Sequence, residues 1–311
     1  MGQPRPLLCR RDLLLGAALA ATGLPFRVAQ ARYVPAEASY RIFMTQPQSH
    51  RLDRFFVAEG DRRYQIFRAI PRQSKANDAH PVIYMLDGNA VFDRLTAEIL
   101  EQVPGLAVVG IGYDTPLLFD ADQRTLDYTP PLGSDGPVPD PTSPGRLSGG
   151  ADAFLARLKG PLQQAAEADL AVDAGRRALW GHSYGGLFAL YCLLRQPTAF
   201  RRYAAISPSI TWGDDVLEPL MAIPRRADDE PAREVLIAYG DSERRLAPGE
   251  ARPAKPSVNA EHVERQGTFA ARLAETANAT VRTEQLTGLG HGETFAASFA
   301  MALALAAAPL E

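Results

Sequence analysis

Short apolar runs alternate with amphipathic stretches from residue 32 onward. Seven runs have the length and the β-branched or aromatic content of strands: residues 64–70, 82–86, 106–112, 178–180, 203–206, 235–239 and 281–286. Four longer stretches have helical periodicity: residues 151–168, 185–195, 262–277 and 294–307. Because strands that alternate with helices usually form a parallel sheet, we expect an α/β fold with a central, mostly parallel sheet and helices on both faces.

Two segments depart from this alternation. Residues 114–150 are rich in Pro, Gly, Ser and Asp and show no periodicity, and residues 241–258 form a second irregular stretch after a predicted strand. A long irregular loop within a compact domain is usually functional. We therefore expect residues 114–150 to form a loop-rich lid insertion that faces the substrate.

The N-terminus has the pattern of an export signal. Arg10 and Arg11 precede an apolar run at residues 13–24, and the segment ends in Val-Ala-Gln-Ala at residues 28–31. A run of about a dozen residues is too short to span a bilayer. The paired arginines resemble a twin-arginine signal, and the final alanines fit a cleavage site. We expect cleavage after Ala31, a single domain over residues 32–311 and a periplasmic location without a membrane anchor.

Charge and cysteine content exclude several classes of function. Loss of residues 1–31 removes four arginines and Asp12, so the net charge of −3 becomes −6. Such an acidic chain is a poor candidate for binding nucleic acid or an anionic membrane. Cys192 would be the single cysteine of the mature chain, which excludes an internal disulfide and a thiolate metal cluster. We expect no metal and no cofactor.

The segment Gly181-His182-Ser183-Tyr184-Gly185 fits the G-x-S-x-G pattern between a predicted strand and a predicted helix. In an α/β-hydrolase, this sharp turn exposes the serine hydroxyl, and glycines two positions away avoid collisions. Ser183 is therefore the predicted nucleophile. The backbone N–H of Tyr184, at the start of the helix, is predicted to stabilise the oxyanion.

The general base is predicted among five histidines: His50, His80, His182, His262 and His291. The first two precede the serine and are expected at the surface. His182 is expected beside the nucleophile as a substrate contact, and His262 as a solvated residue at the start of a helix. His291 lies between two glycines after the last predicted strand, where an α/β-hydrolase places the base that takes the serine proton.

The acid and the second oxyanion donor are less sharply defined by the sequence. After the predicted strand 235–239 stands Gly-Asp-Ser-Glu, so Glu243 and Asp241 compete to orient His291, and we favour Glu243. A Ser-His dyad without an acid is the third alternative. After the strand 82–86, Gly88 would let the backbone approach the substrate closely, so we assign the second oxyanion donor to the Asn89 N–H. A simple turn is the alternative there.

The chain resembles the putative-esterase family, which includes esterase D, feruloyl esterases and siderophore trilactone esterases. The resemblance is carried by five segments: YMLDGN at 84–89, RTLDYTP at 124–130, GHSYGG at 181–186, SPSITW at 207–212, and GHG at 290–292 followed by Phe295 and Ser298. Together these segments look most like the ferric-enterobactin and salmochelin esterases. The elbow motif alone is common to many hydrolases, whereas the second and fourth segments are far more specific.

The resemblance implies hydrolysis of a macrocyclic trilactone built from catecholoyl serine units, with or without bound iron. Arg124 would face an anionic catecholate, or alternatively form a buried pair with Asp127. Trp212 would stack on a catechol ring, or alternatively fill the core. The acidity of the whole chain opposes such an anionic substrate unless arginines gather in the cleft.

Three other functions remain open at this point. The first is an esterase for feruloyl, acetyl or similar small acyl esters, for which a narrow cleft would be expected at residues 114–150. The second is an acyltransferase of the same fold. The third is a noncatalytic periplasmic ligand-binding protein, against which the intact Ser183 and His291 argue.

Overall fold

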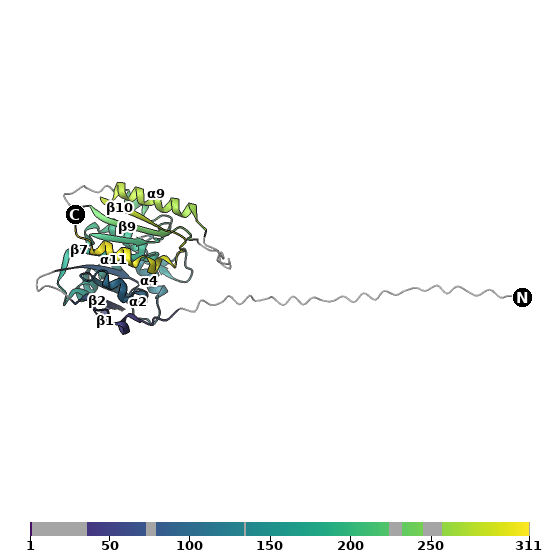
Figure 1. The fold of residues 1–311 in the computed structure, drawn as a ribbon. Coiled ribbons are helices and arrows are strands. Elements are labelled where there is room, and N and C mark those ends of the chain that lie inside the picture. Colours follow the sequence, from purple (N-terminus) through teal and green to yellow (C-terminus); the bar gives the residue numbers. More distant parts are fainter. Residues whose placement is uncertain (2–35, 73–78, 134, 224–231, 245–256, 311) are drawn as a thin grey trace. The chain divides into compact units, whose positions relative to one another are not determined.

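The computed structural model describes Met1 and residues 36–310, apart from residues 73–78, 134, 224–231 and 245–256 (Figure 1). The predicted export signal and most of the second irregular stretch lie outside the described residues. Among the helices of the described part, none combines the length and the apolar character that crossing a membrane requires.

Eight strands of the described chain form one sheet in the order β1-β2-β4-β3-β7-β8-β9-β10. Their bounds are β1 (His50–Glu59), β2 (Arg62–Pro71), β3 (His80–Leu86), β4 (Ala107–Tyr113), β7 (Val172–His182), β8 (Arg202–Ile206), β9 (Arg233–Gly240) and β10 (Ala279–Leu286). The six neighbouring strands β4, β3, β7, β8, β9 and β10 run parallel to one another. At the other edge, β1 pairs antiparallel with β2, and β2 pairs antiparallel with β4. The mostly parallel sheet of an α/β-hydrolase is confirmed.

Helices cover both faces of this sheet, as Figure 1 shows for α2 and α11 on the near side. The helices are α1 (Ile42–Thr45), α2 (Gly88–Arg94), α3 (Ala97–Glu101), α4 (Ala121–Tyr128), α5 (Ala151–Arg157), α6 (Gln163–Glu167), α7 (Tyr184–Arg195), α8 (Glu218–Met221), α9 (Ala260–Thr276), α10 (Thr294–Ala297) and α11 (Phe299–Ala307).

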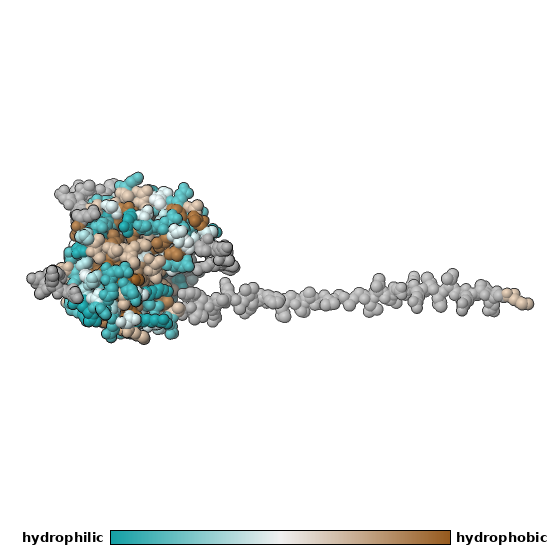
Figure 2. Space-filling view, in the orientation of Figure 1, coloured by the Kyte–Doolittle hydropathy of each residue, from teal (hydrophilic) through white to brown (hydrophobic). Residues whose placement is uncertain are grey.

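The strand sequences explain why both faces are covered. Alternate residues of β3 enter two separate cores: Val82 and Tyr84 pack with α5, α7 and α9, whereas Ile83 and Met85 pack with α2 and α11. A strand that is apolar at every position must be buried on both faces. On the near face, apolar residues gather around α11, whose outward positions are mostly alanine (Figure 2).

Four details differ from the expectations. The strand β1 was not predicted, because charged and apolar residues do not alternate regularly along this edge strand, where both kinds occupy exposed and half-buried positions. The predicted helix 151–168 is interrupted by a π turn, where Gly160 leaves helical geometry before Pro161, which has no N–H to donate. His50 and His80 are buried rather than exposed, and their rings bond the carbonyls of Leu106 and Gly105.

The lid segment 114–150 is also more ordered than expected. It contains the helix α4, which starts where the Asp120 side chain accepts the Gln123 N–H at 2.9 Å. It also contains a short hairpin of β5 (Val138–Pro139) and β6 (Leu147–Ser148). The polar residues that obscured helical periodicity in α4 therefore include its N-terminal cap.

Candidate active site

The predicted nucleophile lies on a strained turn between β7 and α7. Ser183 has φ 59° and ψ −116°, which places a non-glycine residue in left-handed territory. A Cβ on Gly181 would lie 2.1 Å from the carbonyl oxygen of Gly185, so only glycine fits there. The expected collision at Gly185 is wrong, since a Cβ there would meet its nearest neighbour at 3.5 Å. Gly186 is the tighter position, with the Ile206 carbonyl oxygen at 3.0 Å.

Three predicted side chains meet at the carboxyl ends of β7, β9 and β10. The Nε2 of His291 lies 3.0 Å from Ser183 Oγ, and its Nδ1 lies 2.7 Å from Glu243 Oε2. These distances are those of hydrogen bonds from serine to base and from base to acid. Asp241 points elsewhere, accepting the Gly288 N–H at 2.7 Å. The structure thus brings Glu243, and not Asp241, to His291.

The carboxylate of Glu243 is buried and held at its other oxygen. Oε1 accepts the Ser207 hydroxyl at 2.5 Å and the Gly240 N–H at 2.7 Å. Burial alone would raise the pKa of Glu243, but the hydrogen bonds from His291 and Ser207 outweigh it and hold the pKa below its ordinary value. A carboxylate that stays ionised is suited to stabilising a protonated His291.

The His182 side chain contacts the backbone of His291 and does not line the cleft. Its Nε2 lies 2.8 Å from the carbonyl oxygen of His291 and 3.1 Å from Thr294 Oγ1. The two imidazole rings are 4.8 Å apart. Burial, followed by the nearby charge of His291, lowers the pKa of His182 to about 3. The predicted substrate contact of His182 is therefore wrong: the side chain is buried against the backbone of the base and is not one of the described cleft residues.

A cleft of about 590 Å³ opens above these side chains. The lid segment lines one wall through α4 and residues 142–146, the 207–212 segment lines another, and the first turns of α9 line a third. Among the described residues, the cleft carries two glutamates, Glu243 and Glu261, and four arginines: Arg124, Arg146, Arg244 and Arg265. Three of these arginines are paired with carboxylates, Arg124 with Asp87, Arg146 with Asp122 and Arg265 with Glu261, so the cleft is rich in arginine without a clear positive excess.

Arg124 both faces the cleft and forms a buried ion pair, but with a different partner from the one expected. Its Nε and Nη2 donate to the two carboxylate oxygens of Asp87 at 2.8 and 2.9 Å. Asp127 instead accepts the Tyr64 hydroxyl at 2.9 Å and lies 3.4 Å from Arg62. The pairing of Arg124 with Asp127 is thus wrong.

Trp212 takes the packing role that was the alternative to stacking. Its side chain is 2% exposed, belongs to the core and meets the ring of Tyr184 edge-on at 6.4 Å. Its Nε1–H donates to Asp140 Oδ2 at 3.0 Å, which ties the 207–212 segment to the lid. Trp212 therefore shapes the wall of the cleft.

The two predicted oxyanion donors occupy different surroundings. Tyr184 is the first residue of α7, so its N–H has no acceptor within the helix. Asn89 is buried in α2, and its side chain accepts the Tyr113 N–H at 2.8 Å while donating to the carbonyls of Tyr113 and Thr115. Asn89 is not among the described residues that line the cleft. Its amide remains a prediction, whereas its side chain braces the end of β4.

Several residues of the site were missed by the sequence reasoning. Ser207 bonds the acid, Thr294 donates to the carbonyl oxygen of His291 at 2.8 Å, and Ser209 Oγ lies 3.4 Å from Ser183 Oγ. The only sequence signal for Ser207 and Ser209 was their place in the Ser-Pro-Ser segment after a predicted strand.

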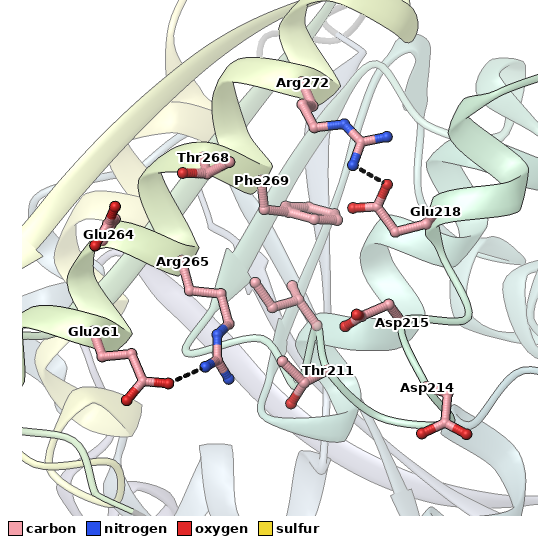
Figure 3. A pocket seen from close by; sticks show the side chains of 11 residues that line it. Thr211, Asp214, Asp215, Glu218, Glu261, Glu264, Arg265, Thr268, Phe269 and Arg272 are labelled. Carbon is pink, nitrogen blue, oxygen red and sulfur yellow. Dashed lines mark hydrogen bonds and ion pairs between the residues drawn. The ribbon is translucent and has the colours of Figure 1, made fainter.

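A second pocket of about 620 Å³ adjoins the cleft between α8 and α9 (Figure 3). The two share Ile210, Thr211, Glu261 and Arg265. In this pocket both arginines are paired with carboxylates, Arg265 with Glu261 and Arg272 with Glu218, while Asp214, Asp215 and Glu264 add negative charge. It contains none of the three side chains that meet at Ser183.

Comparisons with known proteins agree with this geometry. The apo-salmochelin esterase of Escherichia coli O6:H1 is 40% identical over 166 residues, which cover 52% of this chain and 52% of that protein. The ferri-bacillibactin esterase BesA of Bacillus subtilis is 37% identical over 164 residues, which cover 49% of this chain and 55% of that protein. These matches span about half the length of the curated relatives.

A solved structure extends the comparison over most of the fold. The enterobactin and salmochelin hydrolase IroE superposes with a TM-score of 0.66 and 29% identity, covering 86% of this chain and 100% of that one. A family model described as "Putative esterase" matches residues 58–306, well over half of the sequence. The protein belongs to the putative esterase family.

Proposed function

We propose that this protein is a serine carboxylic-ester hydrolase that opens catecholate siderophore trilactones of the enterobactin and salmochelin type. The observation that carries this proposal is the hydrogen-bonded chain from Ser183 through His291 to Glu243 at the base of a cleft lined by arginines. The names of the relatives and the neighbouring structure support the substrate class.

The proposed reaction has two halves. Ser183 Oγ attacks the ester carbonyl carbon while His291 Nε2 takes the hydroxyl proton, and the resulting imidazolium is stabilised by Glu243. The tetrahedral intermediate collapses, the imidazolium gives its proton to the departing alcohol, and an acyl-serine remains. Water then attacks that acyl-serine with His291 again accepting a proton, which releases the acid and restores Ser183.

The developing oxyanion is placed at the N-terminus of α7. The Tyr184 N–H is free to donate there, and the helix dipole adds positive potential. Removal of one such donor usually costs a factor of about 10² to 10³ in kcat. We keep the Asn89 N–H as the proposed second donor.

The size of the cleft and its arginines favour a large anionic ester over a small acyl ester. Four arginines line it, and a volume of about 590 Å³ lies within the range of sites for drug-sized ligands. These guanidinium groups offer hydrogen-bond donors to an anionic ester although the chain as a whole is acidic. Opening one ester of a trilactone yields a linear chain, which holds its catecholates less rigidly around iron than the closed ring does.

We also propose that the mature protein acts in the periplasm. The support is the twin-arginine-like pattern at Arg10 and Arg11 and the cleavage site at Ala31. An exported esterase would meet a siderophore that has crossed the outer membrane.

The proposal is tested with purified residues 32–311 mixed with apo- and ferric enterobactin, with linear products followed by mass spectrometry. We expect ring opening by the wild type and none by Ser183→Ala. Two acid variants form a matched pair: Glu243→Gln should lose most of the activity, whereas Asp241→Asn should keep it.

Each other outcome identifies a different error. Cleavage of a p-nitrophenyl ester without ring opening would keep the hydrolase and reject the siderophore. Full activity in Glu243→Gln would establish a Ser-His dyad. Binding of enterobactin without cleavage of either ester, and without fluorophosphonate labelling of Ser183, would support the noncatalytic alternative.

A further inference from the structure

A second imidazole faces the acid of the proposed site. His262 lies in the first turn of α9, its side chain is 21% exposed, and its Nε2 lies 3.7 Å from Glu243 Oε2. This is the oxygen that His291 Nδ1 already contacts. His262 lies at the start of a helix as expected, but its Nε2 is buried rather than solvated. Within the described structure, its Nε2 is fully buried and has no hydrogen-bond partner.

The start of α9 is tied to the loop that carries the acid. The Asn259 side chain caps α9 by accepting the His262 N–H at 3.4 Å, and its Nδ2 donates to the Glu243 carbonyl oxygen at 2.7 Å. The Asn259 N–H donates to the Asp241 carbonyl oxygen at 2.6 Å. The ring of Tyr239 meets the imidazole edge-on at 5.8 Å. The first turn of α9 and the loop that carries Glu243 are thus joined at two points.

A buried nitrogen without a hydrogen-bond partner destabilises the folded protein, and 3.7 Å is too long for a hydrogen bond. A movement of about 1 Å toward Glu243 would bring Nε2 into hydrogen-bonding range of Oε2. A carboxylate oxygen has two lone pairs and can accept from both imidazoles at once. Glu243 would then be held by the Ser207 hydroxyl, the Gly240 amide and two rings.

We propose that His262 is a positioning residue for the proposed hydrolysis, donating from Nε2–H to Glu243 Oε2 and sharing that oxygen with His291. The inference rests on the proposed function of the same site. His262 acts through Glu243 and contacts none of the reacting atoms. As the second imidazole that donates to Oε2, His262 fixes the Glu243 carboxylate and reduces the negative charge that acts on His291.

Burial keeps His262 in the required neutral form. The imidazole is faced by Glu243 and His291 from two loops, by Arg265 from its own helix and by the ring of Tyr239 from β9. Burial lowers the pKa of His262, and the negative charge of Glu243 opposes this only in part. Without the His262 donor, more of the negative charge of Glu243 would act on His291.

The experiment replaces His262 while keeping or removing the donor. His262→Gln retains a side-chain N–H, and His262→Phe retains the ring contact with Tyr239 without a donor. With a p-nitrophenyl ester, we expect kcat of the Phe variant to fall about fivefold with KM within about twofold, and the acid limb of its pH–rate profile to move to higher pH. We expect the Gln variant to recover most of kcat. Glu264→Gln, on the same helix but outside the cleft, is the control that should change neither value.

A substrate-free measurement separates this inference from the proposed function. The NMR signal of the His291 Nδ1 proton, which reports its hydrogen bond to Glu243, is compared in the wild type, His262→Phe and His262→Gln, and we expect this signal to move in the Phe variant alone. An unchanged signal, or equal changes in both variants, would overturn the positioning role even if siderophore hydrolysis holds. If no ester is cleaved by the wild type, the function fails and the NMR comparison still decides the inference. Should His262→Phe fail to fold, His262→Leu provides the donor-free comparison.

Discussion

Acid should destabilise this protein through His182 more than through any exposed histidine. The imidazole is buried against the His291 backbone, and its pKa is lowered from 6.5 to about 3. In the unfolded chain the same ring would protonate near its ordinary value. Above pH 6.5, the neutral His182 makes its full contribution to the stability of the folded state. This contribution decreases as the pH falls below 6.5 and is completely lost below about pH 3.

The size of the effect follows from that shift. Each pH unit between the two pKa values costs about 1.4 kcal/mol, so lowering the pH from 8 to 5 should remove about 2 kcal/mol through His182. The measurement is urea unfolding of the wild type and His182→Gln at pH 8 and at pH 5. The glutamine keeps an N–H donor near the His291 carbonyl oxygen and does not titrate.

We expect the free energy of unfolding to fall about 2 kcal/mol more in the wild type than in His182→Gln over this pH range. Other buried histidines contribute equally to both proteins and cancel in the difference. Equal pH dependence in the two proteins would refute the assignment of a buried, neutral His182.

Three further substitutions test the acid, the elbow and the C-terminus. Ser207→Ala removes the 2.5 Å hydrogen bond to Glu243 and should lower kcat/KM for a p-nitrophenyl ester about tenfold; unchanged kinetics would mean that the other donors suffice. Gly181→Ala should lower the melting temperature strongly, because its Cβ would lie 2.1 Å from the Gly185 oxygen, whereas Gly185→Ala should fold with a melting temperature close to that of the wild type. Arg202→Met should cost about 2–3 kcal/mol in urea unfolding, since this buried guanidinium bonds the carbonyls of residues 308 and 309 at 2.7 Å; a smaller loss would mean that the C-terminus is anchored by other contacts.

The sequence predicts the fold and the pair Ser183 and His291 because both depend on local patterns. Apolar runs, the G-x-S-x-G turn and a histidine between glycines are visible without knowledge of distant contacts. The choice between Asp241 and Glu243 depends on how the backbone turns after β9, because this sets the direction of each side chain. Within three residues, one carboxylate is directed to the Gly288 amide and the other to His291, and no local pattern distinguishes them.

The remaining errors concern residues whose neighbours are distant in the chain. His182 was expected at the substrate because it stands beside Ser183, but alternation along β7 directs its side chain to the opposite side, under His291. The alternative expected for Arg124 was a pair with Asp127, three residues along the chain, whereas its partner Asp87 lies at the end of β3. Periodicity predicts that a residue is buried more readily than it predicts what that residue contacts.

The proposed base is carried by the least protected strand of the sheet. β10 pairs only with β9, lies at the edge and is largely exposed along its length, and the loop with His291 follows it directly. Segments with few buried contacts open locally at lower free energy than the rest of a protein. Detachment of this edge would remove His291 from Ser183 while the core around α7 stays folded. Heating should therefore abolish activity several degrees before the helical circular-dichroism signal is lost, and coincident transitions would show that β10 opens only with the whole domain.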